Sequence, residues 1–120
     1  MKSEGGSRET ARSIYSQMYE SAADQQTKES AALRLLELDS LDERDAIRLA
    51  LKTFKEKTNR CANNWSQLFP LLKNVKLPLG KDFRIDTANN LVDPSGAAYI
   101  LNKENCDIEL DWKITKIPLR

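Results

Sequence analysis

The segment Asp93-Pro94-Ser95-Gly96-Ala97-Ala98-Tyr99 decides the fold of the second half of this chain. Its first four residues fit a type I turn, which favours Asp at the first position, Pro at the second and Gly at the fourth. Apolar and polar residues alternate on both sides of it, as in half-buried strands. We therefore predict a strand near residues 83–85 and a closing hairpin, in which residues 97–101 pair with residues 108–112.

The hairpin should bury one of its faces, because an isolated hairpin is only marginally stable in water. The alternation continues through Ile108, Leu110, Trp112 and Ile114, with polar residues between them. The side expected to face the core carries Tyr99, Leu101, Leu110 and Trp112.

The first half of the chain has helical periodicity. One helix is predicted from residue 7 or 8 to about residue 23, and a second from about Thr27. Ser40-Leu41-Asp42-Glu43 matches a capping box, which predicts that a third, antiparallel helix starts there. Its first-turn acids, Asp42, Glu43 and Asp45, would then complement the helix dipole. The predicted core face of this helix is Ile47, Ala50, Leu51, Phe54 and Cys61.

A short fourth helix is predicted after Asn64, whose side chain is a good N-cap, and Pro70 should end or kink it. The predicted fold is α+β: an antiparallel bundle of three or four helices over residues 8–74, then a loop-rich segment and a small antiparallel sheet over residues 75–120. Residues 8–120 would form one domain. Residues 1–7 resemble a flexible leader or a cloning remnant, and they lack the apolar stretch of a signal peptide.

The composition argues against catalysis. The chain has no histidine, and its net charge is +1. Histidine is the commonest general base and metal ligand. No activated-nucleophile motif or phosphate-binding glycine loop is present. Four aspartates could supply calcium ligands, but their spacing matches no calcium loop; they are Asp86, Asp93, Asp107 and Asp111. We expect no enzymatic activity, no cofactor and no metal.

A row of cations offers an alternative function. Arg44, Arg48, Lys52 and Lys55 recur at helical spacing and form a basic stripe. Such a stripe could contact the phosphates of a nucleic acid, but no aromatic residues interleave with it to stack on bases. A solvated helix face is the preferred interpretation, and binding of nucleic acid is the alternative.

The two cysteines, Cys61 and Cys106, leave two interpretations open. Their spacing is not that of a zinc site. Cys61 would be a small buried hydrophobe on a helix face, which is how free cysteines usually behave. The second interpretation is a disulfide bridge, which would require the hairpin loop to fold back over the end of the third helix.

Residues 54–101 resemble a segment that recurs in bacterial envelope proteins. A Trp-x-x-Leu turn is followed by Leu-Pro and by Asp-Pro-x-Gly-x-x-Tyr, as in the C-terminal module of certain tetratricopeptide-repeat proteins of unknown function. The globular part of type II secretion pseudopilins is similar more loosely. Here Ser95 replaces the pseudopilin tryptophan, an insertion separates the two motifs, and the pseudopilin calcium loop is missing. The residues that carry the resemblance are Trp65, Leu68, Pro78, Asp93, Pro94, Gly96 and Tyr99.

The resemblance implies an architectural role for these seven residues. It implies a non-enzymatic module for protein–protein interaction or scaffolding, the soluble part of a larger envelope protein in or near the periplasm. A cytoplasmic location is the alternative. We expect the partner to be another protein, with no contact between this segment and a membrane.

Overall fold

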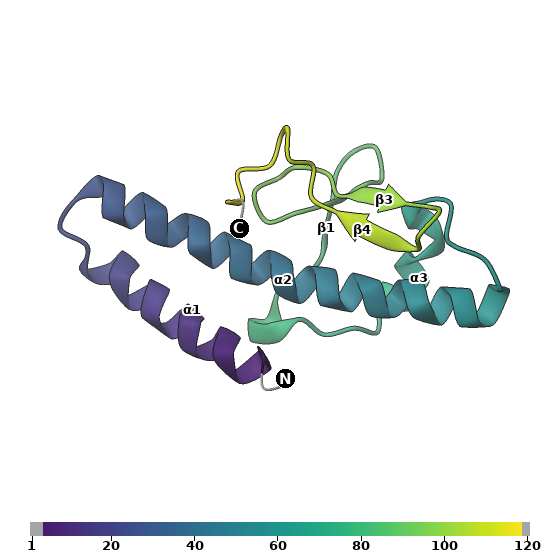
Figure 1. The fold of residues 1–120 in the computed structure, drawn as a ribbon, viewed down its shortest axis with the longest axis horizontal. Helices are drawn as coiled ribbons and strands as arrows, with labels where there is room; N and C mark the ends of the chain where they lie inside the picture. Colours follow the sequence, from purple (N-terminus) through teal and green to yellow (C-terminus); the bar gives the residue numbers. More distant parts are fainter. Residues whose placement is uncertain (1–3, 119–120) are drawn as a thin grey trace.

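One long helix forms the spine of the molecule. The computed structural model describes residues 4–118, and within them α2 (Gln25–Thr58) is a continuous helix of 34 residues (Figure 1). At 1.5 Å per residue it is about 51 Å long. The molecule measures 52 Å along its longest axis, so α2 sets this dimension. The first helix, α1 (Glu4–Ser21), runs antiparallel to the N-terminal half of α2.

The prediction of a helix boundary at Asp39-Ser40 is wrong. Ser40 lies inside α2, where the fully buried hydroxyl Oγ is 2.9 Å from the hydroxyl of Tyr99 and caps no helix. Asp42, Glu43 and Asp45 are consequently in mid-helix and do not occupy a first turn. The second and third predicted helices are one helix. The two long helices form a hairpin and not a bundle of three or four.

The ends of the long helices have clear local causes. Asp24 is the N-cap of α2, and its carboxylate accepts a hydrogen bond from the Thr27 N–H at 3.0 Å. Asn59, in the left-handed conformation, ends the helix. Helix α1 begins at Glu4, so it includes four of the residues that the sequence assigned to a leader, while residues 1–3 lie outside the described range.

Three short helical turns connect α2 to the strands: η1 (Trp65–Gln67), α3 (Phe69–Leu72) and η2 (Pro78–Gly80). The Asn64 cap is confirmed, since its side chain accepts from the Gln67 N–H at 3.1 Å. Pro70 stands in the first turn of α3, where a missing N–H costs nothing. The predicted fourth helix is thus two short turns that meet at Leu68.

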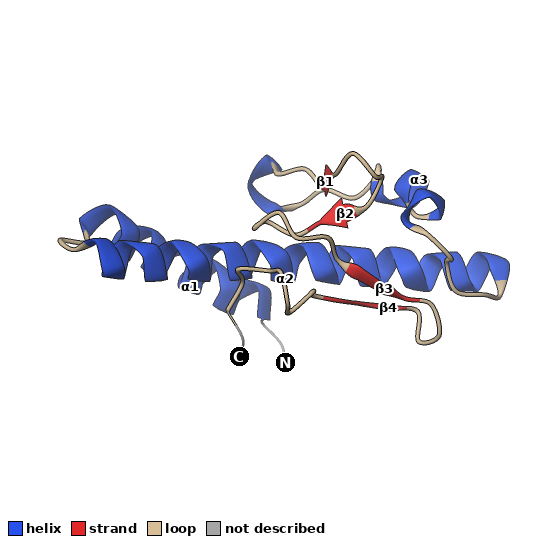
Figure 2. Cartoon of the chain, turned by 90° about the horizontal axis from the view of Figure 1, so that it is seen from above, coloured by secondary structure: helices blue, strands red, loops and turns tan. Residues whose placement is uncertain are grey.

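The strands form two antiparallel pairs. β1 (Arg84–Ile85) pairs with β2 (Leu91–Val92), and β3 (Ile100–Asn102) pairs with β4 (Asp107–Glu109). A bridge between Val92 and Ala98 connects the pairs across the turn at residues 93–96, whose Gly96 N–H donates to the Asp93 carbonyl at 2.9 Å. The predicted turn and hairpin are confirmed, and the hairpin is shorter than predicted. Figure 2 shows β3 and β4 lying along α2 and the β1–β2 pair beside it.

The core lies where α2, the short turns and the strands meet. Its buried side chains come from α2 (Ile47, Leu51), from η1 and α3 (Trp65, Leu72), and from the strands and the chain beside them (Leu91, Tyr99, Ile108, Leu110). Trp112, expected on the side that faces the core, is instead 48% exposed, and Ile114 after it is 67% exposed. The strand has ended by then, and the carbonyl of Asp111 accepts from Ile114 and Thr115 in a turn. The α+β class is confirmed.

Candidate functional site

The seven residues that carry the family resemblance do not converge on one site. Trp65 is 5% exposed and packs in the core between α2 and the strands, together with Leu68 and Tyr99. Pro94 is buried, whereas Pro78 and Gly96 are exposed at turns. Gly96 has φ of +100°, which explains the choice of glycine there.

Asp93 organises the C-terminal segment. Its fully buried carboxylate accepts from the N–H and the hydroxyl of Ser95, each at 2.7 Å. The other carboxylate oxygen accepts from the Thr115 hydroxyl at 2.6 Å. A carboxylate with this many internal donors stabilises a turn and keeps no face open to a ligand, which supports the architectural interpretation.

The most unusual electrostatic environment lies where Tyr99 meets α2. The Tyr99 hydroxyl donates to the Glu43 carboxylate at 2.7 Å and is 2.9 Å from Ser40 Oγ. Arg44 completes the cluster, with its Nε donating to Ser40 Oγ at 3.1 Å. Burial raises the pKa of Glu43 to about 7, although the hydrogen bond from Tyr99 opposes this shift. Burial also raises the pKa of Tyr99, so its phenol stays protonated.

The four cations of the basic stripe fall into two groups: two contact other residues of the fold, and two are exposed at the surface. Besides Arg44, Arg48 is engaged: its Nε donates to the Asp107 carboxylate at 2.7 Å, which attaches the β3–β4 hairpin to α2. Lys52 and Lys55 are exposed. Two of the four cations therefore have carboxylate or hydroxyl partners within the fold.

The two cysteines form a disulfide between Cys61, just after α2, and Cys106, in the loop between β3 and β4. Of the two interpretations of these cysteines, the structure contains the bridge. The hairpin loop folds back over the end of α2, as that interpretation requires. Cys61 lies beyond the last residue of the helix, so its predicted place on a helix face is wrong.

The four aspartates considered for calcium have separate tasks. Asp86 accepts from the Ala88 and Asn90 N–H groups, and Asp111 accepts from the Lys113 N–H. Asp107 pairs with Arg48, and Asp93 closes its own turn. Within residues 4–118, no three acidic or cysteine side chains come together as a metal site would require.

An ion-pair cluster joins α1 to α2 and was not predicted from the sequence. Arg12 donates to Asp39 and Asp42, each at 2.9 Å, and Arg8 donates to Asp42 at 3.1 Å and to Asp45 at 2.7 Å. The two arginines are one helical turn apart, as are the aspartates, so matched spacing was the available signal. Two of the acids attributed to a helix start, Asp42 and Asp45, instead attach α1 to α2.

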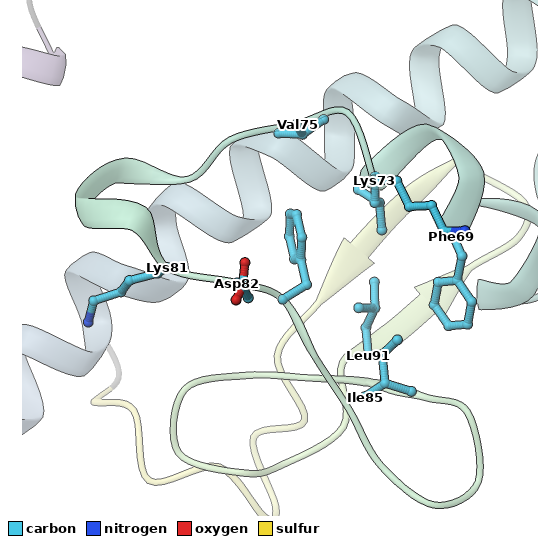
Figure 3. A pocket seen from close by; sticks show the side chains of 9 residues that line it. Phe69, Lys73, Val75, Lys81, Asp82, Ile85 and Leu91 are labelled. Atoms are coloured by element: carbon cyan, nitrogen blue, oxygen red, sulfur yellow. The ribbon is translucent and has the colours of Figure 1, made fainter.

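The strongest candidate for a binding site is an open apolar pocket of about 310 Å³ between α3 and the β1–β2 pair (Figure 3). Its apolar lining comes from three directions: α3, the following segment, and the strands with the residue before β1. The lining side chains are Phe69, Leu72, Val75, Phe83, Ile85 and Leu91, with Lys73, Lys81 and Asp82 at the rim.

The pocket is partly open to solvent on the side formed by the two-residue strand β1. Ile85 is 49% exposed although it is apolar and on a strand. Lys81 extends away from the pocket, where its Nζ donates to Asp39 at 2.7 Å (Figure 3). Sequence analysis missed this pocket because the segment before the predicted strand at 83–85 had been interpreted as a loop. The apolar residues Val75 and Phe83 were the signal.

Comparison with known proteins identifies no relative: no protein-family model, no curated protein and no solved structure matches this chain. The resemblance to tetratricopeptide-associated modules and to pseudopilins stays a prediction. None of the helices in residues 4–118 is long and apolar enough to cross a membrane.

Proposed function

We propose that this protein is a non-enzymatic module for protein–protein interaction or scaffolding, and that it binds its partner at the pocket between α3 and β1. The observation that carries the proposal is an open pocket with an apolar lining. The buried side-chain polar atoms of the described residues, by contrast, all have hydrogen-bond partners within the fold. Concave, mostly apolar sites with a few polar groups at the rim are the usual places for binding.

The hydrogen bonds of the buried polar side chains indicate that these side chains have an architectural role. In the described residues, every buried side-chain nitrogen or oxygen has a hydrogen-bond partner. Ser40 and Glu43 both contact the Tyr99 hydroxyl, and all three residues are buried and do not line the pocket between α3 and β1. A catalytic acid or nucleophile needs access to a substrate. These groups therefore favour a binding function over a reaction.

The location that we propose is the bacterial cell envelope, with the periplasm as the compartment, and we regard the module as the soluble part of a larger protein. Disulfides persist in oxidising compartments and are rare in the cytosol. The Cys61–Cys106 bridge supports the envelope over the cytoplasmic alternative. The resemblance to envelope-protein modules points the same way.

Site-specific photocrosslinking in the native host tests this proposal. A benzophenone amino acid would replace Phe83 in the pocket, and in a matched control it would replace Glu56, an exposed residue near the end of α2. We expect one discrete protein adduct from position 83 and none from position 56. Absence of an adduct at position 83, or the same adducts at both positions, would contradict a partner at this pocket.

Binding of nucleic acid is the second candidate function, and the exposed Lys52 and Lys55 are what supports it. If only these two cations contacted phosphates, the log–log salt slope for duplex DNA would be about −1.8, against about −3.6 for all four cations. We expect no binding in an anisotropy titration at physiological salt. Micromolar binding with either slope, lost in Lys52→Glu/Lys55→Glu, would favour this candidate instead.

A further inference from the structure

We propose that the outer edge of β1 is a docking site for an extended segment of a partner protein, which adds a strand to the sheet and places an apolar side chain in the neighbouring pocket. This inference deepens the proposed function and rests on it, because it specifies how the partner binds. Strand addition supplies affinity through main-chain hydrogen bonds and specificity through pockets for alternate side chains.

The strand register leaves β1 with an unpaired outer edge. Arg84 pairs with Val92, Ile85 pairs with Leu91, and the Asp86 N–H donates to the Asn90 carbonyl at 2.9 Å. In an antiparallel ladder, the N–H and C=O groups of successive residues point alternately toward and away from the partner strand. Because residues 84 and 86 point toward β2, the N–H and C=O of Ile85 point outward. Among the described helices and strands, β1 packs substantially against β2 alone.

The pocket lies on the face that an added strand would share. Ile85 and Leu91 are opposite each other in the ladder, and both line the pocket. Phe83, two residues before Ile85, lines it as well, as the period of two in a strand requires. A strand paired with β1 would place every second side chain on this face, directly beside the residues of the pocket wall.

The charge around the pocket favours an acidic partner segment. Residues 73–85 contain four cations and one anion, whereas the whole chain has a net charge of +1. Lys81 is engaged by Asp39, but Lys73 is exposed at the rim and forms no ion pair with any residue in the 4–118 range. A carboxylate next to the apolar anchor of the partner could pair with Lys73 (Figure 3). The partner segment is therefore extended, alternates apolar residues, and carries an acidic residue beside them.

A random dodecapeptide library, selected on the full chain, provides the probe. The consensus peptide is then synthesised and its Kd measured by fluorescence anisotropy. We expect alternating apolar residues with an adjacent Asp or Glu. N-methylation of successive peptide amides in turn should weaken binding about tenfold or more at every second amide and little at the amides between, since each strand edge uses alternate N–H groups.

Three variants of the protein separate the edge from the pocket. Ile85→Pro removes the outward N–H but no hydrogen bond to β2, a position where strands tolerate proline. Ile85→Ala keeps the N–H and shortens the pocket wall. Thr87→Pro, at an exposed turn position two residues further on, is the matched control. We expect about tenfold weaker binding for Ile85→Pro, weaker binding by a smaller factor for Ile85→Ala, and the parent Kd for Thr87→Pro.

The outcomes distinguish this inference from the function on which it rests. Peptides that lose affinity for a Phe83→Ala variant but bind Ile85→Pro and Thr87→Pro equally, without a period of two in the N-methyl series, would overturn strand addition and leave the interaction function intact. Failure to select any peptide that depends on Phe83 would also overturn it, and the crosslinking at position 83 would then judge the function separately. Concentration-dependent dimerisation that Ile85→Pro abolishes would identify a second copy of this chain as the occupant and overturn the proposed partner. If Ile85→Pro does not fold, the N-methyl series decides.

Discussion

At the scale of single residues, the carboxyl group of Glu43 departs most from its ordinary chemistry. Its pKa rises from 4.5 to about 7 because the side chain is buried beneath the strands, and the hydrogen bond that it accepts from the Tyr99 hydroxyl offsets this rise only in part. Between those two pH values the folded protein binds one more proton than the unfolded chain. Stability contributed by this group is therefore fully present below about pH 4.5 and is lost as the pH rises through 7.

We expect the free energy of unfolding to fall by up to about 1.4 kcal/mol per pH unit between pH 5 and 7 because of Glu43. Glu43→Gln keeps an acceptor for Tyr99 and cannot ionise, so its stability should lack this component. Urea denaturation at pH 5, 6, 7 and 8 measures the difference, with Glu109→Gln, an exposed glutamate on β4, as the control. Parallel pH profiles for the parent and Glu43→Gln would contradict this assignment.

The two tryptophans of the chain make a natural comparison. Trp65 is 5% exposed and contacts the cluster that joins α2 to the strands, whereas Trp112 is 48% exposed on a turn. Trp65→Ala should reduce the free energy of unfolding by roughly 3 to 5 kcal/mol, because it leaves a large cavity. Trp112→Ala should change it by less than about 0.5 kcal/mol. Denaturant unfolding measures both; equal effects would refute the role of Trp65 as the core anchor.

At the scale of elements, α1 depends on charged contacts as much as on apolar ones. Its Ile14 and Met18 face solvent, while Arg8 and Arg12 contact three aspartates on α2. Hydrogen bonds to charged groups contribute about 1.5 to 3 kcal/mol when shielded and less at the surface. The α1–α2 hairpin should consequently be the least stable part of the described fold.

Arg12→Ala should release α1 without unfolding the rest. We expect the amide protons of α1 to exchange at least about tenfold faster, which corresponds to the loss of 1.4 kcal/mol, while the core amides of α2 near Ile47 stay protected. Gln17→Ala, at an exposed position on α1, is the control. Hydrogen exchange followed by NMR provides the measurement. Equal loss of protection in α1 and in the core would show that the hairpin unfolds only with the whole molecule.

At the scale of the whole molecule, the disulfide joins the distal end of α2 to the β3–β4 loop. The bridge spans 45 residues, including η1, α3, β1 and β2. In the chain-entropy model, a closed loop of this size stabilises the folded state by about 4 kcal/mol, with typical measured values of 2 to 4. The bridge therefore closes the part of the chain that contains the pocket-lining residues into one covalent loop.

Reduction should lower the thermal midpoint by about 10 °C, and Cys61→Ser/Cys106→Ser should do the same without reductant. Differential scanning calorimetry with and without dithiothreitol is the measurement, and the double variant, which reductant should not affect, is the control. Two thiols that react rapidly in the unreduced native protein would contradict the bridge.

Local patterns in the sequence predicted the local structures. The turn at residues 93–96, the pairing of Leu101 with Ile108, and the Asn64 cap each depend on neighbouring residues, and each is present. The α+β class was also predictable, because it follows from a change of periodicity along the chain. The pocket between α3 and β1 was not predictable, since its walls come from α3, the segment after it and two strands, and no short stretch of sequence contains them together.

The sequence by itself determined where helix, turn and strand form, because caps, turn residues and apolar periodicity act over a few residues. The absence of Gly and Pro between Gln25 and Thr58 permits one continuous helix, and the tertiary structure decided that α2 continues through Ser40. Ser40 and Glu43 resemble a helix start in isolation and become core residues only because the Tyr99 hydroxyl meets them there. The pairing of Cys61 with Cys106 and the contact of Arg48 with Asp107 had the same origin: each depends on a partner more than 40 residues away.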